Sequence, residues 1–164
     1  MLFLLFHVGS ERYALDTQSV VEVIPRVNLL PYPGTLPSVA GRFNYQGQIL
    51  PVLDLSQLLG DEPCPLAWSS RIVIVDLDRD NPGNCLLGLL AERATETLSG
   101  DRVQQATEGL NLSQEAYLGD VLLQGQHMIQ CLNLDKLLSA ASYEKLMAPP
   151  DLTIALPQET TTIG

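Results

Sequence analysis

Hydrophobic residues along this chain fall mainly into short alternating or continuous runs, which are typical of β-strands, and only two stretches show helical spacing. Proline-rich stretches at 28–37 and 61–69 predict connecting loops between these runs. The predicted strands cover 3–8, 12–15, 20–24, 39–45, 49–53, 71–77, 85–91, 117–123 and 127–132. Helical spacing follows the fifth strand and returns at 134–147, so the pattern predicts an all-β protein with short helices.

The segment 39–60 carries the clearest local signals, a hairpin that runs into a helix. Gln46-Gly47 stands where a tight turn requires positive φ, and the continuous apolar run at 49–53 suits a strand buried on both faces. Asp54 precedes leucines at helical spacing and is expected to cap that helix, which Gly60 should end.

The chain also repeats itself. The triplet at 13–15 matches the one at 87–89, which lies 74 residues further on, and Gln46-Gly47-Gln48 matches 124–126. The helical run at 53–59 matches that at 132–138. Each half therefore holds about five strands ending in a hairpin and a helix. Five short strands bury little as an open sheet, so we expect two five-stranded barrels packed together, with a C-terminal helix.

Composition excludes several classes of protein. With a net charge of −10 over 164 residues, no basic patch could neutralise phosphates, which argues against nucleic acid and anionic membrane surfaces. The apolar opening at 1–9 is far shorter than the roughly 20 residues that span a bilayer. Cys64, Cys85 and Cys131 form no metal-binding or disulfide pattern, so we expect reduced thiols in a cytoplasmic protein without membrane insertion.

Catalytic chemistry has few candidates in this sequence. His7 and His127 lie in strand-like segments without a useful neighbour, and no zinc, nucleotide or hydrolase motif is present. Asp54 could be a carboxylate acid or base, but Asn133 takes its place in the repeat, and Asn caps helices without acid-base chemistry. We therefore expect no catalytic residue, metal site or cofactor; a small enzyme on a barrel scaffold is the remaining alternative.

Candidate partner contacts are more numerous. Glu22 and Glu96 recur at equivalent strand positions, where each is either a solvated residue or a partner contact. Tyr32, Tyr45 and Trp68 are of the type that anchors protein interfaces. The single tryptophan lies in a proline-rich connection, so it could equally close the end of a barrel.

An ordered set of short motifs makes the chain resemble the CheW-like adaptor domain of bacterial chemosensory systems. The resemblance covers about residues 2–140 and predicts one domain at 1–147, followed by a flexible tail at 148–164. The first half carries it through Tyr13-Ala14-Leu15-Asp16, Val20-x-Glu22, Val39-x-Gly41, Asn44, Gly47 and Pro51-Val52-x-Asp54-Leu55. The second half carries it through Gly88-Leu89-Leu90, Glu96 and Leu132-x-Leu134-Asp135-Lys136-Leu137-Leu138.

The resemblance implies two five-stranded SH3-like barrels around a shared apolar core, and a non-enzymatic role without a cofactor. It also implies two partners, namely the regulatory domain of a CheA-type histidine kinase and the cytoplasmic tip of a chemoreceptor. The adaptor would then lie in receptor arrays near the inner membrane. The residues that fall at the family's partner contacts, with their neighbours on the same hairpin, are Val20, Glu22, Gly41, Arg42, Gln46 and Gly47.

Gln46 departs from the family pattern, which usually has Arg at this position. Arg offers a fixed charge and five donors, whereas Gln offers two donors and no charge. Either the partner has changed, or Arg42 supplies the charge from the same hairpin; a decoy that binds only one partner is the alternative function. Leu90-Ala91-Glu92 also replaces a Val-Asp pair that is frequent in the family. The segments at 4–16 and 86–98 are most similar to adaptors of Wsp-type surface-sensing pathways.

Overall fold

A computed structural model describes residues 1–34, 37–60, 62–78, 80–105 and 118–140. Within these ranges the chain forms a ten-stranded sheet with two short α-helices and two single-turn 3-10 helices. The strands are β1 (Leu2–Val8), β2 (Glu11–Asp16), β3 (Val20–Pro25), β4 (Val39–Tyr45), β5 (Gln48–Asp54), β6 (Ser70–Asp76), β7 (Leu86–Ser99), β8 (Gln104–Gln105), β9 (Leu118–Gln124) and β10 (His127–Leu132). The helices are η1 (Thr17–Ser19), α1 (Leu55–Gly60), η2 (Gly100–Arg102) and α2 (Leu134–Ala140).

The mostly-β fold with short helices is confirmed, and the predicted strands agree closely with those observed. The seventh strand is the main difference, because we expected it to end at residue 91 and it continues to Ser99. Its first part is buried throughout, whereas beyond Ala91 mainly Ala94 and Leu98 are buried, so the continuous apolar signal stops where the strand continues. Helix α2 is described to Ala140; the rest of the predicted helix and the tail lie outside the described residues. Neither α1 nor α2 is long and apolar enough to cross a membrane.

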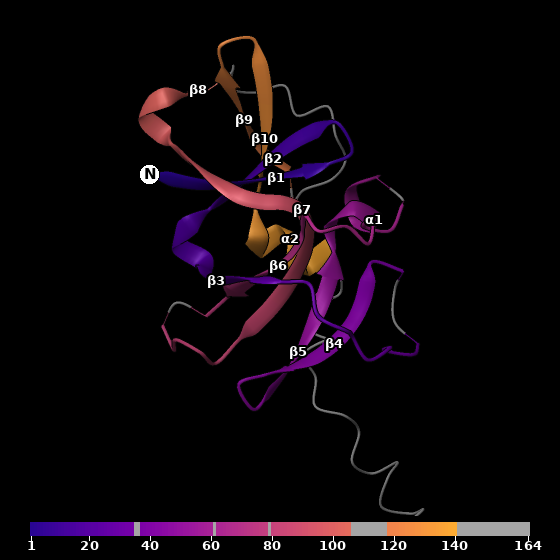
Figure 1. Ribbon diagram of the computed structural model, residues 1–164. Helices are drawn as coiled ribbons and strands as arrows, with labels where there is room; N and C mark the ends of the chain where they lie inside the picture. Colours follow the sequence, from indigo (N-terminus) through magenta and orange to yellow (C-terminus); the bar gives the residue numbers. More distant parts are fainter. Residues whose placement is uncertain (35–36, 61, 79, 106–117, 141–164) are drawn as a thin grey trace, which may run out of the picture.

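Strand β7 connects two lobes of the sheet, as Figure 1 shows in pink through the middle of the molecule. Its first part lies in what we call the first lobe, in the order β3-β6-β7-β5-β4. Its second part lies in the second lobe, in the order β7-β1-β2-β10-β9-β8. A long strand shared by both lobes explains why one continuous sheet contains all ten strands.

The lobes do not correspond to the two halves of the sequence. Strand β5 of the first half pairs in parallel with β7 of the second, and β10 of the second half pairs in parallel with β2 of the first. Residues that match in the repeat even share the same register, since Val52 lies opposite Gly88 and Cys131 lies opposite Ala14. Each half therefore exchanges strands with the other, instead of forming its own lobe. Closure of each lobe into a barrel stays a prediction.

The buried hydrophobic residues form three clusters that follow this arrangement. One cluster lies in the first lobe around Leu50, Ile72 and Leu90, and another lies in the second lobe around Leu5 and Ile129. The largest cluster lies between them, and its main members are Phe6, Leu15, Leu53, Val73, Leu87, Leu89 and Leu137. Because side chains from both lobes share this central cluster, the lobes are expected to be stabilised together.

Candidate partner-binding site

The outermost strands of the first lobe, β3 and β4, meet through a hydrogen bond between side chains. The hydroxyl of Tyr45 on β4 donates to the Oε2 atom of Glu22 on β3, and this bond raises the pKa of Tyr45 above its usual value. Both partners are accessible, because Glu22 is exposed and Tyr45 is half-buried against Phe43, with ring centroids 6.2 Å apart. Glu22 is therefore held in place at the surface and not simply solvated.

The turn beside Tyr45 has the geometry of a tight hairpin. Residues Tyr45 and Gln48 are paired, which leaves Gln46 and Gly47 as the two central residues, with φ values of 52° and 86°. Positive φ at both positions is typical of a type I′ turn. The Oδ1 atom of Asn44 accepts a hydrogen bond from the Gly47 amide at 2.8 Å. These contacts present the exposed Gln46 side chain at the hairpin end, next to the Glu22–Tyr45 pair.

The sequence repeat aligns Gln46 with Gln124, but the two residues occupy different positions in their turns. In the second hairpin, Gln124 and His127 are paired, so the central residues are Gly125 and Gln126. Gln124 has no positive φ, and the structural counterpart of Gln46 is Gly125, with φ 63°. The sequence alignment of the two Gln-Gly-Gln triplets is therefore wrong by one residue. Apart from Gln46, Arg93 is the only described non-glycine residue with positive φ.

Arg42 lies elsewhere on the hairpin. Its guanidinium carbon is 4.6 Å from the centre of the Tyr32 ring, the geometry of a cation–π contact, and its backbone pairs with Leu30. Four residues of extended strand, about 13 Å, separate Arg42 from Gln46. This arrangement therefore argues against Arg42 as the source of the missing charge at the turn.

The remaining predicted contacts, Val20 and Gly41, are less accessible. Val20 is half-buried at the start of β3 and packs against the central cluster. Gly41 is buried in a bulge of β4, where an added Cβ would lie 2.7 Å from the carbonyl oxygen of Leu30. The structure thus brings Glu22, Gln46 and Gly47 together at one surface, with Gly41 shaping the hairpin from beneath.

Asp54 acts as a helix cap, as predicted. Its Oδ1 atom accepts from the Gln57 amide at 3.1 Å, and Asn133 does the same for Lys136 at 3.2 Å. The sequence did not indicate the second bond of Asp54, in which Oδ2 accepts from the Cys64 amide at 2.8 Å. Asp54 therefore also fixes the loop that follows α1.

The histidines and cysteines do not form a second site. His7 and His127 lie on different strands, and burial, followed by the charges of Arg93 and Arg12, lowers the pKa of His7. Cys64, Cys85 and Cys131 form no disulfide with one another, and burial raises the pKa of Cys131 to about 11. In the part of the chain that the structure describes, no three potential ligands gather as a metal site requires.

Two surface features remain. Trp68 does not close the end of a lobe, because its side chain is 99% exposed. A hollow of about 480 Å³, which the sequence did not predict, lies in the second lobe beside Phe3, Asp16, Asp120 and Cys131. Its lining combines residues of the motif at 13–16 with residues of the motif at 132–138, which only the fold could bring together.

The comparisons with known proteins identify the family. The sequence profile of the CheW-like domain matches residues 2–142, nearly all of the described chain. The chain belongs to the CheW-like domain family. Members of this family are non-enzymatic scaffolds of chemotaxis systems, which agrees with the scarcity of candidate catalytic residues noted in the sequence.

Individual relatives of this CheW-like chain are distant. It is 24% identical to chemotaxis protein CheW of Klebsiella aerogenes over 140 residues, covering 84% of this chain and 81% of that protein. It is 29% identical to protein FrzA of Myxococcus xanthus over 146 residues, covering 85% and 86% of the two chains. The crystal structure of scaffolding protein TtCheW from Thermoanaerobacter tengcongensis matches with a TM-score of 0.66 at 24% identity, covering 81% of this chain and 84% of that one. This structural match shows that the CheW-like fold is shared.

Proposed function

We propose that this chain is a cytoplasmic adaptor that couples the tip of a chemoreceptor to the regulatory domain of a CheA-type histidine kinase. Membership of the CheW-like family supports a scaffold role, and relatives named for chemotaxis support the pathway class. The observation that carries the proposal for this chain is the exposed Glu22 carboxylate, held by Tyr45 beside the Gln46 turn. A fixed carboxylate at the surface is a group that a partner can recognise without first ordering it.

Binding to isolated partners tests the proposal directly. The chain is titrated in a calorimeter against the kinase regulatory domain and, separately, against a receptor-tip fragment from the same cell. Micromolar binding to both, about −8 kcal/mol each, suits a reversible component of an array. The adaptor role is contradicted if neither partner binds at about 100 μM.

Glu22→Gln and Glu96→Gln form a matched pair of variants. The two glutamates occupy equivalent positions of the sequence repeat, and both are exposed. In the sheet, Glu22 lies opposite Ile74 and Glu96 lies opposite Leu5. We expect Glu22→Gln to weaken binding of one partner at least about tenfold, because a charged interface contact is lost. Glu96→Gln should bind as wild type, and equal losses in both variants would show that the Glu22 surface is not special.

The decoy function differs in its prediction for kinase activity. Gln46 lacks the charge that the family usually places at this turn, so a decoy would bind one partner and fail to bridge. In a kinase assay reconstituted with receptor, full activation by the wild-type chain would exclude the decoy. A decoy instead requires that wild type leaves the kinase inactive and that Gln46→Arg activates it.

A further inference from the structure

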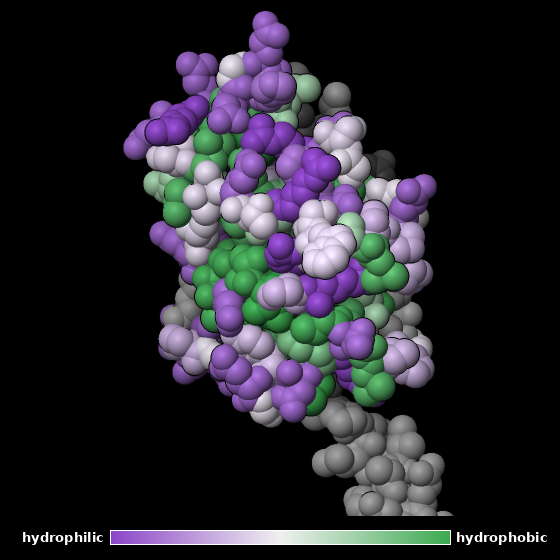
Figure 2. Space-filling model, viewed as in Figure 1, coloured by the Kyte–Doolittle hydropathy of each residue, from purple (hydrophilic) through white to green (hydrophobic). Residues whose placement is uncertain are grey.

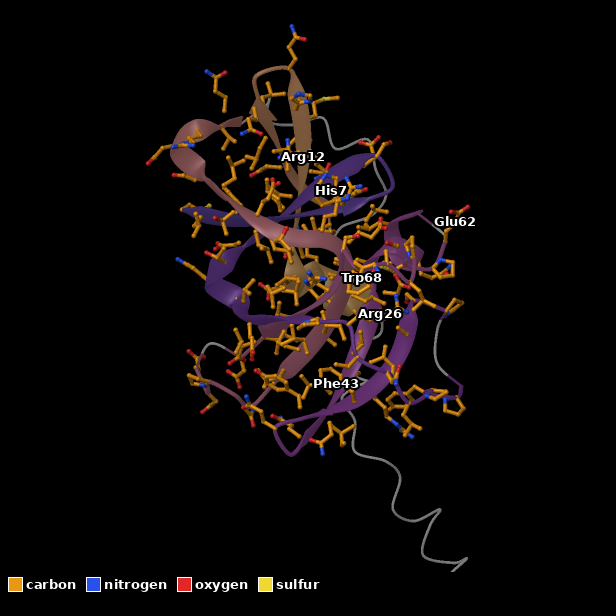
Figure 3. The ribbon with its side chains drawn as sticks, in the orientation of Figure 1. His7, Arg12, Arg26, Phe43, Glu62 and Trp68 are labelled. Carbon is orange, nitrogen blue, oxygen red and sulfur yellow. The ribbon has the colours of Figure 1, made fainter. Side chains whose placement is uncertain are left out.

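The loop at 62–69 displays two large hydrophobic side chains to solvent. Trp68 is 99% exposed and Leu66 is 86% exposed. Trp68 is the only tryptophan of the chain, and it lies at the front of the molecule directly above Arg26 (Figure 3). Tryptophan and arginine are among the residue types most enriched at the positions that dominate binding energy at interfaces.

The backbone of this loop is held in place from several sides. The Cys64 amide is bound by Asp54, and the Pro65 carbonyl accepts from Ser70 Oγ at 2.6 Å and from Arg26 Nη1 at 3.2 Å. The Trp68 carbonyl accepts from Arg71. A loop that is already ordered loses little conformational entropy when a partner binds. The exposed indole is therefore presented on a rigid support.

A hollow of about 350 Å³ adjoins these side chains. It is lined by Arg26, Val27, Asn28, Leu66, Ala67 and Trp68. Hydrophobic residues gather across the middle of the same face, over β3, in Figure 2. A hollow of this kind can accept an apolar side chain whose neighbours contact the indole.

Two cationic side chains lie at the loop although the chain as a whole is acidic: Arg26 lines the hollow, and Arg71 donates to the Trp68 carbonyl. Arg26 and Arg71 both hold the loop through backbone carbonyls, and within the described ranges neither forms an ion pair with a carboxylate. The chain as a whole has a net charge of −10. Two arginines that have no carboxylate partner within the described ranges, next to an exposed indole, therefore favour a ligand that combines apolar and acidic groups.

We propose that Trp68, Leu66 and the adjoining hollow form a docking surface for a segment of a partner protein that carries an apolar side chain flanked by carboxylates. This surface is separate from Glu22 and the Gln46 turn, so it goes beyond the adaptor contacts proposed above. A second copy of this chain is a poorer occupant, because two chains with a charge of −10 each repel one another.

Fluorescence of the single tryptophan tests the proposal on the intact protein. The probe is a short synthetic peptide with a Phe-Leu pair between glutamates, and its control replaces the glutamates with lysines. We expect the acidic peptide to shift the emission to shorter wavelength with a Kd below about 1 mM, and the basic peptide to bind at least about tenfold more weakly. Added salt should weaken the acidic complex, because the Debye length falls to about 3 Å at 1 M.

Two variants locate the binding surface. Leu66→Ser leaves Trp68 and the loop hydrogen bonds in place and should weaken the acidic peptide at least about tenfold. Met128→Ser removes another exposed hydrophobic residue, 69% exposed in the second lobe, and should bind as wild type. The proposal is overturned if the acidic peptide gives no shift at 1 mM, if both peptides bind alike, or if Leu66→Ser binds as wild type. It is also overturned if the emission shifts with protein concentration alone, which would assign the surface to a second copy.

Discussion

The two hairpins that end the sequence halves share one plan but differ in what surrounds them. The first hairpin unit (β4, β5 and α1) and the second hairpin unit (β9, β10 and α2) each have a bulge in the first strand, a two-residue turn and a side-chain cap. In the first unit, residues 50–56 are all buried, whereas β10 is buried only in part. The same local sequence pattern therefore contributes differently to each lobe.

The caps illustrate the difference. Asp54 is 6% exposed and uses both carboxylate oxygens, one for its helix and one for the Cys64 amide. The Asn133 side chain is half-buried, and among the described residues its Oδ1 atom accepts only from the Lys136 amide. A cap that also fixes a distant loop should matter more to stability than one that serves only its own helix.

The largest effect is expected at Gly41. Gly41→Ala places a Cβ against Leu30 at φ 148°, so strain and overpacking together should lower the free energy of unfolding by about 3 kcal/mol. Gly119 lies in the corresponding bulge of the second hairpin unit, where an added Cβ is no closer than 3.6 Å to its nearest neighbour. Gly119→Ala should cost less than about 1 kcal/mol. Urea unfolding measures both, and equal costs would remove the contrast between the hairpins.

The caps give the next largest contrast. Asp54→Ala loses a cap and leaves the Cys64 amide without its acceptor, so we expect a loss of about 2–3 kcal/mol. Asn133→Ala loses only a cap, about 1 kcal/mol. The measurement is the midpoint of urea unfolding, compared at an unchanged slope of the free energy of unfolding against urea concentration. If Asn133→Ala is the more damaging variant, the second hairpin unit carries more tertiary structure than its contacts indicate.

Substitutions in the two turns should change the free energy of unfolding in opposite directions. Gln46 adopts a left-handed backbone that costs roughly 1 kcal/mol for most residues, whereas Asn tolerates it and Asn-Gly favours this turn. Gln46→Asn should therefore raise the free energy of unfolding by about 0.5 kcal/mol. Gly125→Ala, at φ 63°, should lower it by about 1 kcal/mol. Thermal unfolding distinguishes the two signs, and a destabilised Gln46→Asn would contradict the assigned turn.

The smallest effect concerns the bond between the Tyr45 hydroxyl and Glu22, which joins β4 to β3 in the first lobe. Because this bond raises the pKa of Tyr45, its contribution to stability is present below the unfolded tyrosine pKa of about 10 and is lost above it. Tyr45→Phe should cost about 1 kcal/mol or less at pH 7 and flatten the loss of stability at alkaline pH. Urea titrations from pH 8 upward provide the measurement, and an alkaline loss of stability that is the same in Tyr45→Phe and wild type would contradict the role of this bond.

Much of the first hairpin unit was predictable from the sequence, because its signals are local. The turn at Gln46-Gly47, the cap at Asp54 and the end of α1 at Gly60 each depend on neighbouring residues only. The site was predictable in part. Glu22 and Tyr45 were both candidates, but their contact joins strands that are far apart in the sequence, and no local pattern indicates it. Similarly, nothing in the loop at 62–69 could show whether Trp68 is exposed.

By itself the sequence determined most of the strands, the caps, the repeat and the family, since each depends on residue types at fixed spacing. The tertiary structure decided which strands pair between halves, and it placed Glu22 beside Tyr45. It also decided the one-residue offset between the two turns and the exposure of Trp68. The physical reason is that repeats and periodicity constrain each segment alone, whereas long-range pairing depends on the shared core that only the assembled lobes create.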